Sequence, residues 1–183
     1  MKIAIDAGHG MDNRITGKYD PGAVSAGVSE ADIALQWALT GKWILNNAGI
    51  QTYMIRDNDT DSAPVESRDN RATQNGCDRM ISIHCNSSAS ANASGTESFY
   101  RTRDDHDFAK IIHGAALTAL KLRDRGIKSE GQSQHPSLAV LDFPRPNMLL
   151  ELGFITNPGD RRALLSRDAR VMFWQQVVKA LKS

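Results

Sequence analysis

Two histidines follow separate apolar runs, and their spacing could serve metal chemistry. His9 comes after Lys2–Ile5 within Asp-Ala-Gly-His-Gly, and His84 comes directly after Met80–Ile83 within Ser-Ile-His-Cys-Asn. Both runs predict buried strands, each ending close to its histidine. The carboxyl ends of parallel strands form the edge at which open α/β proteins bind ligands. Two imidazoles that meet at this edge from distant parts of a chain are typical of a zinc site.

Two carboxylates could complete such a site. Glu151 ends the apolar run Met148–Leu150, and a carboxylate with apolar neighbours on both sides is costly to desolvate. We therefore expect Glu151 to meet a cation, hold a proton or perform a catalytic task. Glu30 follows Ser29 at the start of a predicted helix, where serine caps and an acid interacts favourably with the helix dipole. From position alone, we favour this helix-start role for Glu30.

The remaining ionisable candidates carry weaker signals. His106 lies in a run of charges, His113 on a predicted helix and His135 in a polar loop, and we interpret all three as solvated or capping residues. Asp6 could orient a ligand histidine or satisfy the amides of a turn. Glu97 stands in an alternating strand, where it could face either the solvent or the site.

Size and composition are those of an ordinary globular domain. The 183 residues suffice for one core without covalent staples, and 40% are hydrophobic while 23% are charged. Lysine and arginine number 22 against 21 acids, so the charge gives no reason to expect nucleic acid. Cys77 and Cys85 cannot form a disulfide framework, although a single bridge stays open, and we interpret both as small apolar residues.

No targeting or membrane segment is predicted. No apolar stretch is long enough to cross a bilayer, so we expect no membrane insertion. The amino terminus reaches Asp6 before the apolar core of a signal peptide could form. We therefore expect a protein that is made and initially kept in the cytosol.

Strand-like and helical patterns alternate along the chain. Strands are predicted at residues 2–5, 50–55, 80–83, 96–100, 138–141 and 147–151. Helices are predicted at residues 30–47, 65–75, 108–122, 160–166 and 168–181, and polar loops at 7–29 and 129–137. This alternation, with no internal repeat or linker, predicts one α/β domain over residues 1–183. Its sheet is expected to be mainly parallel and twisted, with about six strands flanked by helices.

The ordered set of motifs resembles the type-3 family of zinc-dependent N-acetylmuramoyl-L-alanine amidases, which remove stem peptides from peptidoglycan. The matching segments are Asp6-Ala-Gly-His-Gly, Asp20-Pro-Gly-Ala, the helix-initial Glu30, Arg68 with Ala72, Ser82-Ile-His-Cys-Asn, Gly95-Thr-Glu-Ser-Phe-Tyr and Leu150-Glu-Leu-Gly-Phe-Ile-Thr-Asn-Pro. Together they cover essentially the whole chain. Three departures are Thr73 in place of an asparagine, a longer polar loop at 11–18, and residues 131–135, where the family varies.

The resemblance implies a role for each site residue. His9, Glu30 and His84 would bind one zinc ion, which keeps a fourth coordination position open for catalysis. Glu151 would be the catalytic glutamate, taking a proton from the attacking water and passing it to the leaving L-alanine nitrogen. The substrate would be peptidoglycan, cut between the lactyl group of N-acetylmuramic acid and L-alanine. The family fold is a mixed α/β sheet flanked by helices, and we expect a monomer.

Two other functions remain open from the sequence. A zinc endopeptidase or deacetylase would use similar metal chemistry, and only its products would differ. A non-catalytic wall-binding module would have no physical need for Glu151, so the presence of all four site residues argues against it. The absence of an export signal favours a phage endolysin, and the catalytic domain of a longer exported enzyme is the alternative setting.

Overall fold

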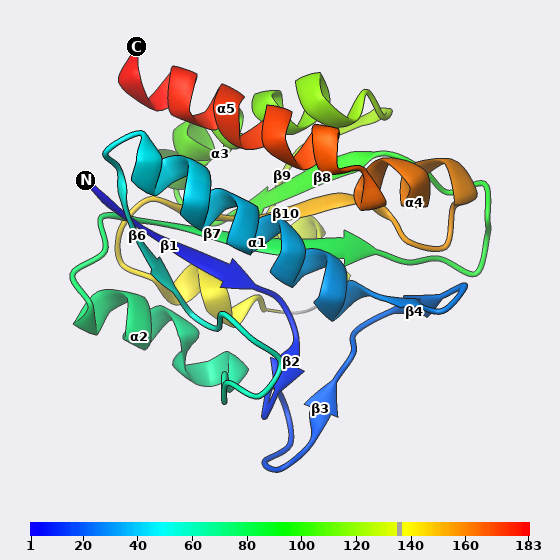
Figure 1. Ribbon diagram of the computed structural model, residues 1–183, viewed down its shortest axis with the longest axis horizontal. Helices are drawn as coiled ribbons and strands as arrows, with labels where there is room; N and C mark the ends of the chain where they lie inside the picture. Colours follow the sequence, from blue (N-terminus) through cyan, green and yellow to red (C-terminus); the bar gives the residue numbers. More distant parts are fainter. Residues whose placement is uncertain (135–136) are drawn as a thin grey trace.

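The fold is built on one six-stranded sheet in a computed structural model that describes residues 1–134 and 137–183 (Figure 1). Its strands are β1 (Lys2–Ala7), β6 (Gln51–Met54), β7 (Arg79–Asn86), β8 (Thr96–Tyr100), β9 (Asp124–Ser129) and β10 (Asn147–Phe154). Their spatial order is β6-β1-β7-β10-β8-β9. All neighbouring pairs are parallel except β10 and β8. The expected α/β fold with a mainly parallel sheet is confirmed.

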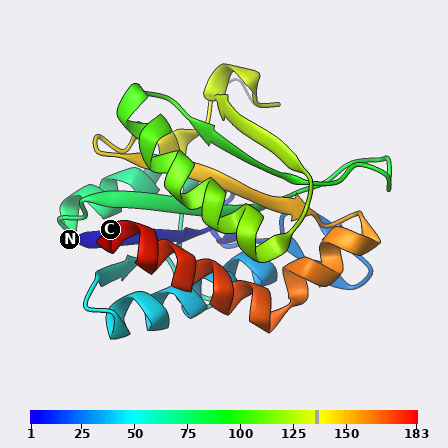
Figure 2. The same cartoon turned by 90° about the horizontal axis from the view of Figure 1, so that it is seen from above.

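Five α-helices complete the described part of the domain. They are α1 (Glu30–Asn47), α2 (Arg68–Gln74), α3 (Arg103–Leu120), α4 (Pro158–Leu165) and α5 (Arg167–Lys182). Helices α1, α5 and α3 pack next to one another, with α5 in the middle (Figure 2). Among the described residues, no helix combines the length and the apolar character that crossing a membrane requires.

Alternation along the strands separates two cores. On β7, Ile81 and Ile83 belong to the larger core, which contains the buried residues of α1, α3 and α5. Met80 on β7 and Leu149 on β10 belong to a smaller core with Ala72 of α2. Side chains two residues apart on a strand share a face. Positions 84 and 151 therefore lie on the face of the smaller core, beyond the part that α2 covers.

The predicted helices were largely correct because their patterns are long. Helix α1 has the predicted bounds, and Ile33, Trp37 and Ile44 on its apolar side are buried. The segment predicted as one helix at 65–75 is a 3-10 turn at Val65–Ser67 followed by α2. Helix α3 begins at Arg103, earlier than predicted, because Thr102 and Asp105 form a capping box.

Two strand assignments were wrong. The apolar run 138–141 was predicted as a strand, yet Ala139–Asp142 forms a 3-10 turn that buries Val140 in the smaller core. Strand β9 was missed because its sequence, Asp-Arg-Gly-Ile-Lys-Ser, is mostly polar. Among the described strands, β9 lies at the edge of the sheet and pairs only with β8, so few of its side chains need to be apolar.

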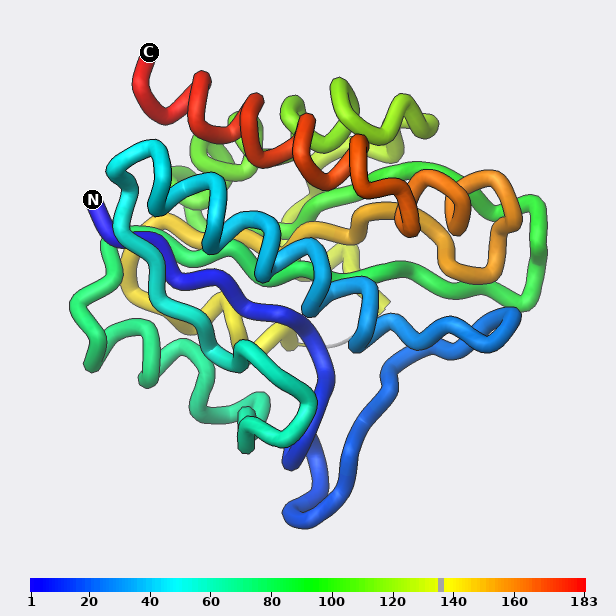
Figure 3. Tube along the Cα trace, viewed as in Figure 1, coloured from blue at the N-terminus to red at the C-terminus, as the bar shows by residue number. Residues whose placement is uncertain are grey.

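The long polar loop between β1 and α1 has local structure. It contains two pairs of two-residue strands, β2 (Gly10–Met11) with β3 (Tyr19–Asp20) and β4 (Val24–Ser25) with β5 (Val28–Ser29). Figure 3 shows both hairpins extending away from the main sheet. The predicted loop at 129–137 begins with a 3-10 turn at Glu130–Gln132.

Candidate metal centre

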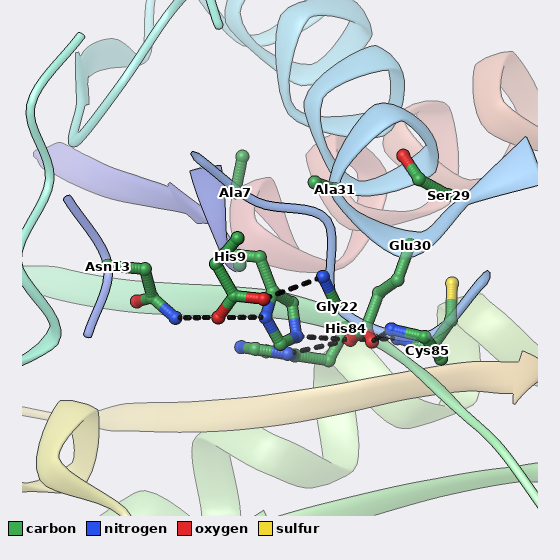
Figure 4. Close-up of polar contacts among 12 residues, drawn as sticks. Ala7, His9, Asn13, Gly22, Ser29, Glu30, Ala31, His84 and Cys85 are labelled. Carbon is green, nitrogen blue, oxygen red and sulfur yellow. Dashed lines mark hydrogen bonds and ion pairs between the residues drawn. The ribbon is translucent and has the colours of Figure 1, made fainter. Parts of the chain in front are cut away.

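His9, Glu30 and His84 meet at one point (Figure 4). Oε1 of Glu30 lies 3.0 Å from Nε2 of His9 and 2.9 Å from Nδ1 of His84. One ligand atom from each residue lies within 4.8 Å of the others. Two imidazoles and one carboxylate are a donor set of catalytic zinc sites. The chemistry and the spacing of these side chains therefore fit a zinc ion.

Each side chain comes from a different element. His84 lies within β7, which continues to Asn86 instead of ending before the histidine as predicted. His9 follows the last residue of β1 by two positions, and Glu30 is the first residue of α1. Ser29 caps this helix by accepting a hydrogen bond from the main-chain nitrogen of Asp32, as predicted. The helix start thus also directs the Glu30 carboxylate toward both rings.

The carboxylate of Glu30 is buried and fully engaged. Besides the two rings, Oε1 accepts a hydrogen bond from the main-chain nitrogen of Cys85, and Oε2 accepts one from that of Ala23. Burial alone would raise the pKa of Glu30, but the contacts with His84 and His9 outweigh it and hold the pKa well below its ordinary value. Glu30 therefore presents an ionised carboxylate to both rings.

Two buried arginines hold the turn that carries His9. Arg56 donates hydrogen bonds to the carbonyl oxygens of Ala7 at 3.0 Å and Gly8 at 2.9 Å. Arg68 donates to the carbonyls of Ala7 at 3.0 Å and His9 at 2.8 Å. His9 has a φ of 61°, a left-handed conformation that costs a non-glycine residue about 1 kcal/mol or more. These hydrogen bonds stabilise the turn against that strain.

A second contact fixes the ring of His9. Oδ2 of Asp20 lies 3.1 Å from Nδ1 of His9 and accepts a hydrogen bond of 2.7 Å from Nδ2 of Asn13. Burial alone would raise the pKa of Asp20, but hydrogen bonds from Asn13, Gly22 and His9 lower it to about 2. An ionised acceptor at Nδ1 favours the tautomer in which Nε2 is free to bind a metal. The sequence motif at Asp20 did not reveal this contact.

Asp6 has neither of its predicted partners. It is fully buried, forms an ion pair with Arg68 and accepts a hydrogen bond of 2.6 Å from the hydroxyl of Ser82. Burial alone would raise the pKa of Asp6, but the charge of Arg68 and the Ser82 hydrogen bond outweigh it and lower the pKa. Arg68, which also donates to the carbonyl of His9, therefore links Asp6 to the turn that carries His9.

Two glycines allow the chain to pass close to the rings. A Cβ atom on Gly22 would stand 2.6 Å from Oε2 of Glu30 and 2.7 Å from Cδ2 of His9. A Cβ atom on Gly8 would overlap the ring of His84. Glycine at these two positions is therefore required by close packing against the three candidate ligands.

Glu151 faces the same site, and the described part of the chain leaves one of its oxygens without a hydrogen-bond partner. It is the register partner of His84 on β7 and of Glu97 on β8. Its Oε2 atom is buried and has no hydrogen-bond partner among the described residues. Burial, together with the negative charges of Glu30 and Glu97, raises the pKa of Glu151 well above its ordinary value. Such a carboxyl is suited to holding a proton.

A pocket of about 490 Å³ joins these groups. Its lining includes the three candidate ligands, Glu151, and apolar and polar residues from several other segments. These further residues include Asn13, Arg14, Asn86, Glu97, Phe99, Leu138, Val140 and Leu149. The part of the smaller-core face that α2 leaves open is thus a cleft. It combines polar groups with apolar residues such as Phe99 and Leu149, as ligand-binding sites commonly do.

The other predicted positions have mixed outcomes. His113 is buried instead of solvated, and it contacts the Ser98 hydroxyl at 2.8 Å and Asp124 at 3.0 Å. The ring of His106 packs on Tyr100 at a centroid distance of 4.7 Å. His135 lies outside the described residues. Both cysteines are free and buried, which confirms their interpretation as small apolar residues.

Comparison of the sequence with known proteins identifies the family to which the chain belongs. The sequence profile described as N-acetylmuramoyl-L-alanine amidase matches residues 3–183. The chain is 32% identical to the uncharacterized protein YqiI of Bacillus subtilis, with 99% of this chain and 83% of YqiI aligned. It is 30% identical to the N-acetylmuramoyl-L-alanine amidase LytC of the same organism over 88% of this chain, but spans only 31% of LytC.

A solved structure supports the same assignment. The catalytic domain of CwlV, an N-acetylmuramoyl-L-alanine amidase from Bacillus (Paenibacillus) polymyxa var. colistinus, superposes with a TM-score of 0.84 at 28% identity. The superposition covers 99% of this chain and 96% of that domain. Sequence profile, relatives and fold agree over nearly the entire length. The chain therefore belongs to the N-acetylmuramoyl-L-alanine amidase family.

Proposed function

We propose that this protein is a zinc-dependent amidase that cleaves between the lactyl group of N-acetylmuramic acid and L-alanine in peptidoglycan. The observation that carries the proposal is the meeting of two imidazoles at Oε1 of Glu30. Glu151 lies in the same pocket, and its Oε2 atom has no hydrogen-bond partner among the described residues. Membership of the amidase family supports the substrate class.

His9, Glu30 and His84 would hold the metal through Nε2, Oε1 and Nδ1, the atoms that face one another. Zinc held by these three side chains supplies a Lewis acid for the amide carbonyl and lowers the pKa of water to about 7. Asp20 fixes the direction of His9, and the two buried arginines fix its main chain.

Glu151 moves the proton in this proposal. Its Oε2 atom has no competing donor among the described residues, so it can accept the proton of a water that attacks the amide carbonyl carbon. The carbon–nitrogen bond then breaks, and Glu151 returns the proton to the L-alanine nitrogen. The transfer is needed because an amine cannot leave as an anion. No covalent bond to the protein forms.

Digestion of purified sacculi tests this function. We expect zinc-loaded protein to release peptides with a free L-alanine amino terminus, chelation to abolish the release, and added zinc to restore it. New amino termini other than L-alanine would indicate a wall endopeptidase. Binding to sacculi without any release would indicate a wall-binding module. Either result contradicts the proposal.

The biological setting that we propose is degradation of the bacterial cell wall, as an autolysin or as a phage endolysin. Membership of the amidase family supports wall degradation, and the relatives above include the amidase LytC of Bacillus subtilis. We propose a monomer, because one chain supplies the three candidate ligands and Glu151, so that the site needs no residue from a second copy. Gel filtration at micromolar concentration checks this, and a dimeric elution volume would contradict it.

A further inference from the structure

A row of ionisable side chains crosses the sheet at the level of the proposed metal centre. His84 on β7 pairs with Glu151 on β10, and Glu151 pairs with Glu97 on β8. Residues directly opposite on neighbouring strands point to the same face. All three residues line the same pocket. The site therefore extends across the strands, from the proposed metal centre at β7 toward the sheet edge at β9.

The edge strand β9 adds two cations to this row. Nε of Arg125 donates a hydrogen bond of 2.8 Å to Oε2 of Glu97, and Nζ of Lys128 donates one of 2.6 Å to the same oxygen. The register of β8 and β9 shifts here, so that β9 carries an extra residue near Gly126, whose φ is +89°. This bulge explains how residues three apart can face one carboxylate.

Glu97 anchors these cations instead of taking part in proton transfer. Its other oxygen accepts a hydrogen bond of 2.6 Å from Nδ2 of Asn86. Burial alone would raise the pKa of Glu97, but Lys128, Arg125 and Asn86 outweigh it and lower the pKa. Glu97 is therefore an ionised, fully paired carboxylate, which suits a structural support better than a catalyst.

Arg125 and Lys128 keep unused capacity for an anion. Two positive charges share one carboxylate, which leaves one net positive charge in the cluster. Their side chains are 30% and 27% exposed, so solvent and substrate can reach them. The terminal guanidinium nitrogens of Arg125 have no hydrogen-bond acceptor among the described residues. Guanidinium and ammonium groups with free N–H donors bind carboxylates.

The distance of Arg125 and Lys128 from Glu151 indicates which part of the stem peptide they could contact. Strand β9 lies two strands beyond β10, which is about 10 Å at the usual strand spacing. An extended peptide advances about 3.3 Å per residue, so a carboxylate branching from the second residue would reach this distance. We propose that Arg125 and Lys128 bind a carboxylate on the second residue of the stem peptide. This inference rests on the proposed function.

The proposal predicts substrate discrimination by charge. Two synthetic muramoyl peptides should be compared that differ only in a carboxylate or a carboxamide on the second residue. We expect kcat/KM of the zinc-loaded protein to be about tenfold higher for the carboxylate, as for hydrogen bonds to charged groups. Lys128→Met should bring the ratio close to one by slowing only the carboxylate peptide, and Lys128→Arg should preserve the preference.

A matched control separates this role from a general effect of charge or folding. Lys110 is exposed on α3 and pairs with Asp107, so Lys110→Met makes the same chemical change outside the Glu97 cluster. It should keep the wild-type ratio. Lys128→Met leaves Arg125 paired with Glu97, so the thermal midpoint should change little.

Three results are distinguishable. Equal wild-type rates on both peptides would overturn the carboxylate site. Equal slowing of both peptides by Lys128→Met would also overturn it, and would assign Lys128 a purely structural role. Failure of the wild-type protein to cleave either peptide would contradict the proposed function itself. Free peptide should also inhibit the wild-type protein more strongly as the carboxylate than as the carboxamide.

Discussion

Oδ2 of Asp20 lies 3.1 Å from Nδ1 of His9, while Nε2 of the same ring faces Glu30. The two residues come from a polar segment that forms no part of the main sheet. A hairpin between β2 and β3 brings them together. The orientation of one candidate ligand is thus fixed by a short, local pairing of the chain.

Asp20→Asn should weaken zinc binding. An amide at this position replaces an ionised acceptor with a weaker one, and loss of such a partner lowers metal affinity by about 10- to 100-fold. Competition with a chromophoric chelator measures the affinity directly. Asp104→Asn is the matched control, because Asp104 is exposed in the first turn of α3. Unchanged affinity in Asp20→Asn would show that Asp20 does not support the ligand.

His84→Ala should lower the metal content of the purified protein from one zinc to a small fraction. The change removes one of three donors that meet within 4.8 Å and leaves Glu30 with one ring. Elemental analysis after dialysis gives the stoichiometry. His106→Ala, which changes a ring outside the cluster, should retain full occupancy. Full occupancy in His84→Ala as well would remove His84 from the ligand set.

Glu151→Gln should bind zinc normally, but its turnover should fall by about 100-fold or more. This is the contribution that general acid–base catalysis makes to a reaction rate. The amide is nearly isosteric but cannot accept and return the proton. Turnover and metal content should be measured on the same preparation. Glu66→Gln, at an exposed position, is the control. Near wild-type turnover in Glu151→Gln would exclude the proton-transfer role.

The pair of Asp6 and Arg68 should make the protein sensitive to acid. The folded pKa of Asp6 lies below its ordinary value of 3.8, so the carboxylate stabilises the fold fully above pH 3.8. This contribution is lost as the pH falls through the lower, folded pKa. Denaturant midpoints between pH 2 and 6 should therefore drop steeply at the acid end of that range.

Asp6→Asn supplies the comparison for this pH profile. It should destabilise the protein by about 3 kcal/mol at neutral pH, because removing one partner leaves the buried Arg68 charge uncompensated. Its stability should then vary less with pH below 4. A variant profile parallel to the wild-type profile would show that another carboxylate controls the acid transition.

Local patterns in the sequence determined much of the fold. The helical periodicity of residues 30–47 and the apolar runs that precede His9 and His84 each depend on neighbouring residues, so they could be recognised without knowing the rest of the structure. The desolvated environment of Glu151 was likewise evident from the leucines on both sides. The family resemblance implied a ligand role for Glu30, which its position at a helix start had not favoured, and the structure places its carboxylate between both rings.

Contacts between distant segments were decided only by the tertiary structure. β9 is a strand because β8 supplies its hydrogen-bonding edge, and its own polar side chains gave no periodic signal. Asp6 binds Arg68, and Asp20 contacts His9, because strand register and a loop hairpin bring them together. Burial periodicity is a property of neighbouring positions, whereas the partner of a buried charge depends on which elements the whole fold packs against it.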